Sequence, residues 1–166
     1  MAGRVRRPIV GALLLVAAVT GSGPVAALPG ADMLLRDQHG TVLARISLPE
    51  GSRITLRYRN SLYGSVAEER FVVQKHALRL VELAADERAV LDEYYVVDHP
   101  VARTEPGDAR AWRGTPRDAL ALQRLAVAAT DLGKRTLIVP GRSPIDLWRL
   151  VDDRQPTVFI ALQPSG

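Results

Sequence analysis

The feature that most constrains the fold of this chain is a hydrophobic alternation within residues 53–74. Ile54, Leu56 and Tyr58 occupy every second position, and polar or charged residues stand between them. A period of two is typical of a strand that is buried on one face. Turn-forming residues occupy much of the segment 60–65, and the alternation resumes after it. The pattern therefore predicts two antiparallel strands joined by a polar loop.

The returning strand places a carboxylate among apolar side chains whichever of its faces is buried. Glu69 shares one face with Phe71 and Val73, and Glu68 shares the other with Val72. An ionised carboxylate is costly to bury unless partners compensate its charge. Glu69 then either braces the adjoining loop from within or helps to hold a ligand or docking partner, and the sequence leaves both interpretations open.

Short apolar segments separated by turn signals continue along the rest of the chain. Gly40 stands where a hairpin turn needs a positive φ. Leu78, Leu80 and Glu82 are expected on one face of their strand. This rhythm predicts a mainly β domain, an antiparallel β-sandwich or open barrel with at most one or two short helical turns. The further strands are expected at 33–36, 41–48, 77–83, 122–130, 136–139, 145–150 and 157–162, although 145–150 could equally be one helical turn. The expected core comprises Ile54, Leu56, Tyr58, Phe71, Val73, Leu80, Leu125, Val127, Leu137, Val139, Leu147, Phe159 and Ala161.

Three segments are ambiguous between helix, strand and loop. Residues 84–97 favour a short helical turn followed by a strand, although an extended run also fits. Thr115 offers a helix N-cap and the proline after it a first helical position, so at most one helical turn is expected within 116–123. Residues 99–117 form a long expected loop that Trp112 holds to the core.

The first 27 residues have the anatomy of a secretory signal peptide. Three arginines precede an apolar run of about 11 residues, which is too short for the roughly 20 that a membrane span needs. Residues 1–27 are therefore expected to be a signal peptide, and residues 28–166 a single extracytoplasmic β-rich domain without a membrane span. Cleavage after Ala27 gives a periplasmic or extracellular protein, whereas an uncleaved segment gives a membrane-tethered one.

The composition of the chain argues against a nucleic-acid partner and excludes cysteine chemistry. The formal net charge is +4, but Arg4, Arg6 and Arg7 belong to the expected signal peptide, and without them 19 basic residues face 18 acidic ones, a charge of +1. No basic excess then remains for a nucleic-acid partner. The chain has no cysteine, which excludes disulfides, thiolate catalysis and cysteine-ligated zinc.

No metal site, cofactor site or catalytic constellation is expected. His39, His76 and His99 lack the spacing of metal ligands and lie in or near turns. Ser61 would need a base to act as a nucleophile, and no histidine is near it in the sequence. The sequence therefore predicts a protein that is not an enzyme.

A resemblance to a known family rests on two stretches, LRYRNSLYGSVAEERF and LAVAATDLGKRTLIVPGRSPIDLWRLVDDRQPTVFIAL. They resemble a domain-of-unknown-function family of small exported bacterial proteins, often encoded beside the permeases of TAXI-type TRAP solute transporters. In that family a tyrosine-bearing strand leads to a His-Ser pair, and a glutamate follows shortly before an aromatic residue. Tyr58, Ser61, Glu69 and Phe71 match this order, whereas Asn60 stands in the place of the histidine.

The resemblance carries a function with it. A second histidine, in the late hairpin of the family, is replaced by Lys134 and Arg135. Asparagine cannot titrate near neutral pH or ligate a metal well. The absence of the two family histidines therefore argues against metal binding or proton transfer at this site. The resemblance implies a non-enzymatic extracytoplasmic accessory or binding module of a TAXI-type TRAP transporter, with the permease or its solute receptor as partner. The alternatives are a small-ligand-binding protein and, ranked last, a hydrolase.

The expected contact surface combines the polar loop with aromatic residues. An accessory module needs an exposed apolar or aromatic patch, and Tyr94 or Tyr95 is a further candidate for it. The residues expected to contact a partner or ligand are Tyr58, Asn60, Ser61, Tyr63, Glu69 and Trp112.

Overall fold

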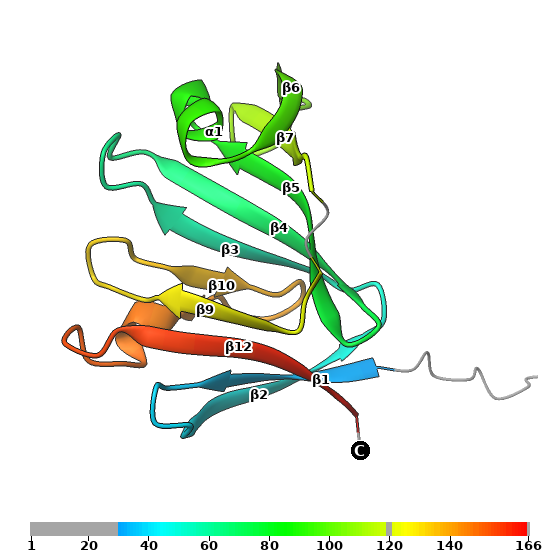
Figure 1. The fold of residues 1–166 in the computed structure, drawn as a ribbon, viewed down its shortest axis with the longest axis vertical. Coiled ribbons are helices and arrows are strands. Elements are labelled where there is room, and N and C mark those ends of the chain that lie inside the picture. Colours follow the sequence, from blue (N-terminus) through cyan, green and yellow to red (C-terminus); the bar gives the residue numbers. More distant parts are fainter. Residues whose placement is uncertain (1–29, 119–120, 166) are drawn as a thin grey trace, which may run out of the picture.

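Two antiparallel sheets account for the alternating pattern of the chain (Figure 1). The computed structural model describes residues 30–118 and 121–165, and the expected signal peptide 1–27 lies outside them. The sheets are open and enclose a shared apolar core, so the predicted mainly β sandwich is confirmed. Within the described ranges, no helix combines the length and the hydrophobicity needed to cross a membrane.

The first sheet has four strands in the order β2-β1-β12-β9. They are β1 (Gly30–Arg36), β2 (Val42–Pro49), β9 (Arg124–Ala128) and β12 (Thr157–Pro164). The second sheet has eight strands, in the order β11-β10-β3-β4-β5-β7-β6, with β8 also paired to β5. They are β3 (Arg53–Arg59), β4 (Val66–Gln74), β5 (Ala77–Ala85), β6 (Val97–Arg103), β7 (Trp112–Pro116), β8 (Ala121–Leu122), β10 (Thr136–Ile138) and β11 (Ile145–Asp146). The helical elements are α1 (Arg88–Tyr94) and the 3-10 helix η1 (Leu147–Arg149). The expected strand 145–150 is therefore wrong beyond its first two residues, and the helical turn that the same segment also allows is present instead.

The hairpin of β3 and β4 is the element that the alternation predicts, and it lies in the middle of the second sheet (Figure 1). Ile54 pairs with Phe71 across the two strands, and Ile54, Leu56 and Phe71 are each at most 3% exposed. Directly opposed residues on antiparallel strands point to the same face, so this face closes the core against the first sheet. The buried residues of this core are Ala31, Met33, Leu35, Ile46, Leu48, Ile54, Leu56, Phe71, Val73, Leu78, Val127, Ala129, Leu137, Val139, Leu147, Val158, Ile160 and Leu162.

The last strand, β12, buries the face opposite to the predicted one. Phe159 and Ala161 are only half-buried, and the prediction that they lie in the core is wrong, because the buried positions include Val158 and Ile160 instead. The middle of this strand is apolar on both faces, so alternation cannot orient it. The pairing with β9 decides the facing, since Val158 lies opposite the buried Val127, whereas Phe159 and Ala161 lie opposite exposed residues of β9.

A β-bulge reverses the facing of β5 partway along its length. Phe71 of β4 pairs with Leu80, but the preceding residue, Arg70, pairs with Glu82, so Val81 is the extra residue. Two residues on the bulged strand then oppose one on its partner. The prediction that Glu82 shares a face with Leu80 is therefore wrong, and Glu82 points outward beside Arg70.

The far end of the second sheet carries α1, β6 and β7 and has an apolar cluster of its own (Figure 1). The helical turn followed by a strand that residues 84–97 favour is confirmed as α1 and β6. Val90 and Leu91 of α1 have no exposed surface and pack into this cluster. Its buried members are Tyr58, Ala67, Leu83, Ala85, Val90, Leu91, Val97 and Val101.

Residues 99–117 do not form one long loop, and that prediction is wrong. β6 and β7 pair with each other here, which shortens the irregular connection to 104–111. Residues 115–116 end β7 rather than begin a helix, because pairing with β6 satisfies their backbone groups in extended form. The expected strand 122–130 is present as β8 and β9, which divide at Gln123, where the chain passes from the second sheet to the first.

Candidate functional site

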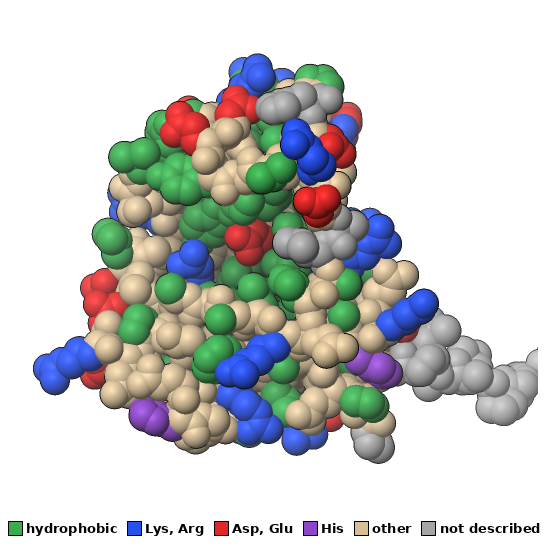
Figure 2. Space-filling view, viewed as in Figure 1, with side chains coloured by type: hydrophobic (Ala, Val, Ile, Leu, Met, Phe, Trp, Pro, Cys, Tyr) green, Lys and Arg blue, Asp and Glu red, His purple; other side chains and the backbone are tan. Residues whose placement is uncertain are grey.

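A pocket of about 280 Å³ opens where β3, the end of α1 and the turn before β10 meet. Figure 2 shows a hollow on this face, between the part that carries α1 and the part that carries β9, with acidic and basic side chains among hydrophobic ones. Three segments that are far apart in the sequence therefore form one concave surface. The pocket is lined by Tyr58, Arg59, Asn60, Ser61, Tyr94, Tyr95, Thr130, Leu132, Gly133 and Arg135.

The loop between β3 and β4 takes its shape from Asn60. Asn60 is 4% exposed, and its Oδ1 accepts the backbone N–H groups of Leu62 and Tyr63, both at 3.0 Å. Its own backbone N–H donates to the carbonyl of Ser65 at 2.8 Å. Gly64 has a φ of +63°, a conformation that glycine adopts without strain. Asn60 therefore acts mainly on the loop itself, through an amide oxygen that carries no charge.

The turn that precedes β10 brings a cation to the pocket. The backbone N–H of Arg59 donates to the carbonyl of Gly133 at 2.8 Å, which fastens this turn to the end of β3. Arg135 follows the turn, and its Nη1 donates to the carbonyl of Ala128 at 2.6 Å. Its guanidinium carbon lies 5.2 Å from the centre of the Tyr58 ring, within the range of a cation–π contact. This turn therefore presents a permanent positive charge to the pocket.

Behind the pocket, a carboxylate is linked to two tyrosines. The Tyr95 hydroxyl donates to Glu69 Oε1 at 2.9 Å, and the hydroxyls of Tyr95 and Tyr58 hydrogen-bond to each other. Glu69 is thus tied to the residue that follows α1, while the loop 60–65 is held by its own backbone and by Asn60. Of the two interpretations that the sequence leaves open, a role for Glu69 at the pocket accords better with these contacts.

The environment of this cluster shifts the pKa of each of its members upward. Desolvation raises the pKa of the Glu69 carboxyl above its ordinary value, and the hydrogen bond from Tyr95 and the charge of Arg135 oppose the shift only in part. Burial likewise raises the pKa of Tyr58. The pKa of Tyr95 lies far above its ordinary value because of burial and then the nearby charge of Glu69. Both phenols therefore keep their protons at neutral pH, and Glu69 is the member of the cluster that can change its charge.

We expect the free energy of unfolding of Glu69→Gln, relative to that of the wild type, to increase as the pH rises. Above the ordinary carboxyl pKa of 4.5, the folded protein still holds this proton while the unfolded chain has lost it. The contribution of Glu69 to stability is therefore fully present below that pH and is lost as the pH rises through the folded-state pKa. The variant cannot titrate here, so its advantage should grow by at most about 1.4 kcal/mol per pH unit across this window.

Urea unfolding of both proteins at about pH 4 and about pH 7 measures this difference. Glu105→Gln removes a carboxylate whose side chain is 75% exposed, and it controls for the loss of one negative charge. An equal stability difference between wild type and Glu69→Gln at both pH values would contradict the expectation.

The structure brings together most of the residues that the sequence singles out. Tyr58, Asn60 and Ser61 line the pocket, and Glu69 lies behind Tyr58 through the hydrogen-bonded hydroxyls. Tyr63 belongs to the same loop and is 37% exposed. These five residues therefore occupy one region of the surface.

Trp112 lies apart from the pocket lining. It is partly buried against the cluster beneath α1, and the guanidinium carbons of Arg103 and Arg88 lie 4.1 and 5.8 Å from the centre of its ring. Conversely, the sequence did not single out Arg135 as a site residue. Its one signal was the resemblance, which marks that position as a departure from a histidine.

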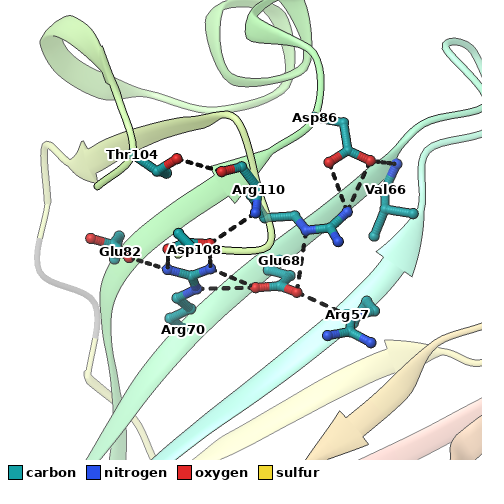
Figure 3. A network of polar contacts seen from close by, with 9 residues as sticks. All are labelled: Arg57, Val66, Glu68, Arg70, Glu82, Asp86, Thr104, Asp108 and Arg110. Atoms are coloured by element: carbon teal, nitrogen blue, oxygen red, sulfur yellow. Dashed lines mark hydrogen bonds and ion pairs between the residues drawn. The ribbon is translucent and has the colours of Figure 1, made fainter. Parts of the chain in front are cut away.

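A second polar cluster covers the outer face of β3, β4 and β5 (Figure 3). Glu68 is 4% exposed and accepts hydrogen bonds from Arg57 Nε at 3.0 Å and Arg70 Nη2 at 2.8 Å. Arg70 also donates to Glu82 at 2.7 Å and to both carboxylate oxygens of Asp108 at 2.7 and 2.8 Å. Asp108 lies on the connection between β6 and β7, so Arg70 ties that connection to the sheet.

The same connection is held at a second point. Arg110 donates from Nη1 to both oxygens of Asp86, at 2.8 and 2.9 Å. The hydrogen bonds from Arg70 are the main reason that the pKa of Asp108 is lowered to about 2. Because the charged groups of this outer cluster are engaged with one another (Figure 3), we assign it a structural role.

The chemistry of the pocket favours binding. Among the described residues, its lining contains two cations, Arg59 and Arg135, together with hydroxyl and amide groups, and neither a histidine nor a carboxylate. Ser61 is exposed and has no imidazole beside it in this lining. Across 30–118 and 121–165, histidine and acidic side chains do not gather in a group of three that could hold a metal ion.

Comparisons with protein-family models, with curated proteins and with solved structures each find no match. The function therefore has to be inferred from the site itself and from the sequence resemblance.

Proposed function

We propose that this protein is a non-enzymatic extracytoplasmic binding module that docks onto a component of a TAXI-type TRAP solute transporter. The observation that carries the proposal is a group of exposed apolar side chains on the three segments that form the pocket. Tyr94 and Leu132 line the pocket and are 50% and 66% exposed, and Leu62 and Tyr63 on the adjoining loop are 67% and 37% exposed. These four residues form the apolar rim.

The apolar rim is a local concentration of exposed hydrophobic surface. Seven large apolar residues are exposed in the described part of the chain, and four of them belong to this rim. Clustered apolar side chains on a soluble surface mark interaction sites, and tyrosine in particular is enriched in protein interfaces. Since the rim is presented by a loop, a helix end and a turn that β3 and β10 anchor, the scaffold can hold it ready for a partner.

The class of partner comes from the sequence resemblance, which implies the permease or its solute receptor. An extracytoplasmic location accords with the expected signal peptide. A complete solute receptor usually binds its ligand deep between two lobes, whereas this chain offers one sandwich and a pocket of about 280 Å³. A hydrolase gains no support, because Ser61 has no base in the pocket lining. The pocket itself does favour a second function, the binding of a small ligand.

We expect Tyr63→Ala and Leu132→Ser to weaken partner capture without unfolding the domain. Both side chains are exposed, and surface substitutions change the free energy of unfolding by no more than about 0.5 kcal/mol. Val42→Ser is the matched control, since Val42 is 45% exposed on β2 in the first sheet. The measurement is affinity capture of the tagged full chain from membranes of its native host, with identification of the captured proteins.

The proposal predicts that the TRAP permease or its solute receptor is captured by the wild type and by Val42→Ser, and less by the two rim variants. Equal capture by all four proteins would remove the rim from the interface. Capture of no TRAP component by the wild type would refute the assigned partner. Unfolding of Tyr63→Ala, seen as a large fall in melting temperature, would show that Tyr63 belongs to the core.

A further inference from the structure

The hydroxyl chain behind the pocket has a direction that depends on the charge of Glu69. Each tyrosine hydroxyl has one proton to donate. When Glu69 is ionised, Tyr95 donates to it and Tyr58 in turn donates to Tyr95, so Tyr58 offers only lone pairs to the pocket. When Glu69 is protonated, it can donate to Tyr95, Tyr95 to Tyr58, and the Tyr58 proton then points into the pocket. Protonation of one partly buried carboxyl thus turns an acceptor at the pocket wall into a donor.

The charges of the pocket wall favour an anion. Arg59 and Arg135 line it and no carboxylate does, and the one carboxylate in the hydroxyl chain lies behind Tyr58 and Tyr95. The Arg135 guanidinium has five N–H donors, and among the described residues its one hydrogen bond runs from Nη1 to a backbone carbonyl. Donors of this guanidinium therefore remain to face a ligand, and guanidinium groups pair with carboxylates in a matching planar geometry.

We infer that the pocket binds a small organic carboxylate, held by Arg135 and by the Tyr58 hydroxyl, and that this anion binds together with a proton taken up by Glu69. The volume of about 280 Å³ lies just below the range of sites for drug-sized ligands, which limits the ligand to a small acid. The proton comes from solvent and stays on Glu69, and no covalent bond to the ligand forms. This ligand site does not depend on docking at the apolar rim, and each can fail without the other.

The expected pH dependence of this binding comes from Glu69 itself, because the groups that face it do not change their charge near neutral pH. Across the sheet, Glu69 is flanked by Leu56 of β3 and Leu83 of β5, which carry no charge. From the other side it meets Tyr95 and, at longer range, Arg135. Burial keeps the phenol of Tyr95 protonated, and an arginine stays charged throughout.

The neighbours of the Tyr58 hydroxyl add no second group whose protonation would change ligand binding with pH. They are Tyr95, Tyr94 and Arg135, and burial raises the pKa of the Tyr58 phenol itself. Glu93 lies at the rim, where it raises the pKa of the Tyr63 phenol. Binding of a carboxylate should therefore strengthen as the pH falls through the pKa of Glu69 in the free protein and weaken as it rises, by up to tenfold per pH unit.

Calorimetric titration of the full chain with lactate, succinate and benzoate, at about pH 5 and about pH 8, tests the inference. Titration in two buffers of different ionisation enthalpy counts the protons taken up with the ligand. We expect at least one of the three anions to bind, more tightly at the lower pH, with a net uptake of protons at the higher pH. Lactamide, which is neutral and nearly the same shape as lactate, should bind far more weakly.

Two conservative variants separate this role from a structural one. Glu69→Gln has an amide that can donate to Tyr95 at every pH, so its affinity should not depend on pH, should exceed that of the wild type at about pH 8, and should involve no proton uptake. Tyr58→Phe removes the donor to the ligand and should weaken binding roughly ten- to a hundredfold, as expected for a hydrogen bond to a charged group. Melting temperatures no lower than that of the wild type establish that the fold is intact in both variants.

Three results would overturn the inference. The first is the absence of saturable binding for all three anions up to roughly 10 mM, beyond which affinity is too weak for a built site. The second is binding that takes up no proton, or that keeps its pH dependence in Glu69→Gln. The third is equal affinity for lactate and lactamide, which would show that the pocket does not recognise the charge.

Discussion

Phe71→Ala is expected to lower the free energy of unfolding by about 3–5 kcal/mol, the usual loss when a fully buried phenylalanine is truncated. Phe71 is 2% exposed and pairs with Ile54 and Leu80 on the strands beside it. It therefore packs at the middle of the second sheet, on the face that meets the first. Truncation would leave a cavity between the two sheets that the surrounding side chains fill only in part. Urea or thermal unfolding of the two proteins measures the loss.

The chain has one other phenylalanine, which makes a matched control. Phe159 lies on β12, is half-buried, and has the guanidinium carbon of Arg124 at 3.6 Å from the centre of its ring. Since its ring faces away from the core between the sheets, Phe159→Ala should destabilise the protein much less than Phe71→Ala. Equal losses of unfolding free energy from both substitutions would show either that Phe159 also packs in the core or that Phe71 does not.

Arg70→Met should also destabilise the domain strongly, by about 3 kcal/mol at neutral pH, because the buried Glu68 loses its closest cation and keeps only Arg57 and, farther away, Arg110. Glu68, Glu82 and Asp108 all pair with this guanidinium, and the Glu68 side chain is 4% exposed. Methionine keeps most of the length and apolar stem of the arginine. Three carboxylates would then face one another across the outer side of β4 and β5.

The stability difference between the wild type and Arg70→Met should depend on pH. In the wild type the pKa of Asp108 is about 2, against an ordinary value of 3.8. The stability that this carboxylate contributes is therefore present above pH 3.8 and is lost as the pH falls toward about 2. The gap between wild type and variant should narrow over the same window. Unfolding curves at about pH 7 and about pH 3 measure this change.

Arg113→Met is the control for Arg70→Met. Arg113 pairs with Glu105 at 2.9 Å, but the two side chains are 40% and 75% exposed, and exposed ion pairs contribute little to stability. This control should leave the unfolding curve nearly unchanged. Adding Asp108→Asn to Arg70→Met should recover part of the lost stability, because it removes one of the charges left facing each other. If Arg70→Met is no less stable than Arg113→Met, the outer cluster does not hold the fold together.

The local loss in Arg70→Met should concentrate in the connection between β6 and β7. Asp108 ties this connection to β4 through Arg70, and Arg110 ties it to Asp86 at the end of β5. Without Arg70 one of these two anchors is absent. Backbone amide exchange within 104–111 should therefore rise before exchange in β3 and β4, since segments with fewer buried contacts open at lower free energy.

The amino-acid sequence by itself determined the strands whose two faces differ in polarity. In β3, apolar residues such as Ile54 and Leu56 alternate with Thr55 and Arg57, and a shift of one residue would bury the whole polar set. One facing is therefore far more stable than the other, whatever the neighbouring strands are. The hairpin turn at Gly40, with a φ of +86°, is local for a related reason, because few other residues adopt that conformation without strain.

Tertiary structure decided the facing of strands that are apolar on both sides or irregular in register. β12 could bury either face on its own pattern, and its pairing with β1 and β9 chose Val158 and Ile160. In β5 the bulge at Val81 moved Glu82 to the outer face, where Arg70 meets it. Neither outcome is visible in a single strand, because each depends on which residue of another strand lies opposite.

The pocket is the clearest product of tertiary structure. The sequence indicated Tyr58 and Glu69 because they belong to one well-patterned hairpin, but Tyr95 and Arg135 come from the end of α1 and from the turn before β10. What unites them is the strand order β10-β3-β4-β5, which is selected because it lets both sheets bury their apolar faces at once. Spacing along the chain records local geometry, whereas the meeting of distant side chains depends on the free energy of burying the whole core.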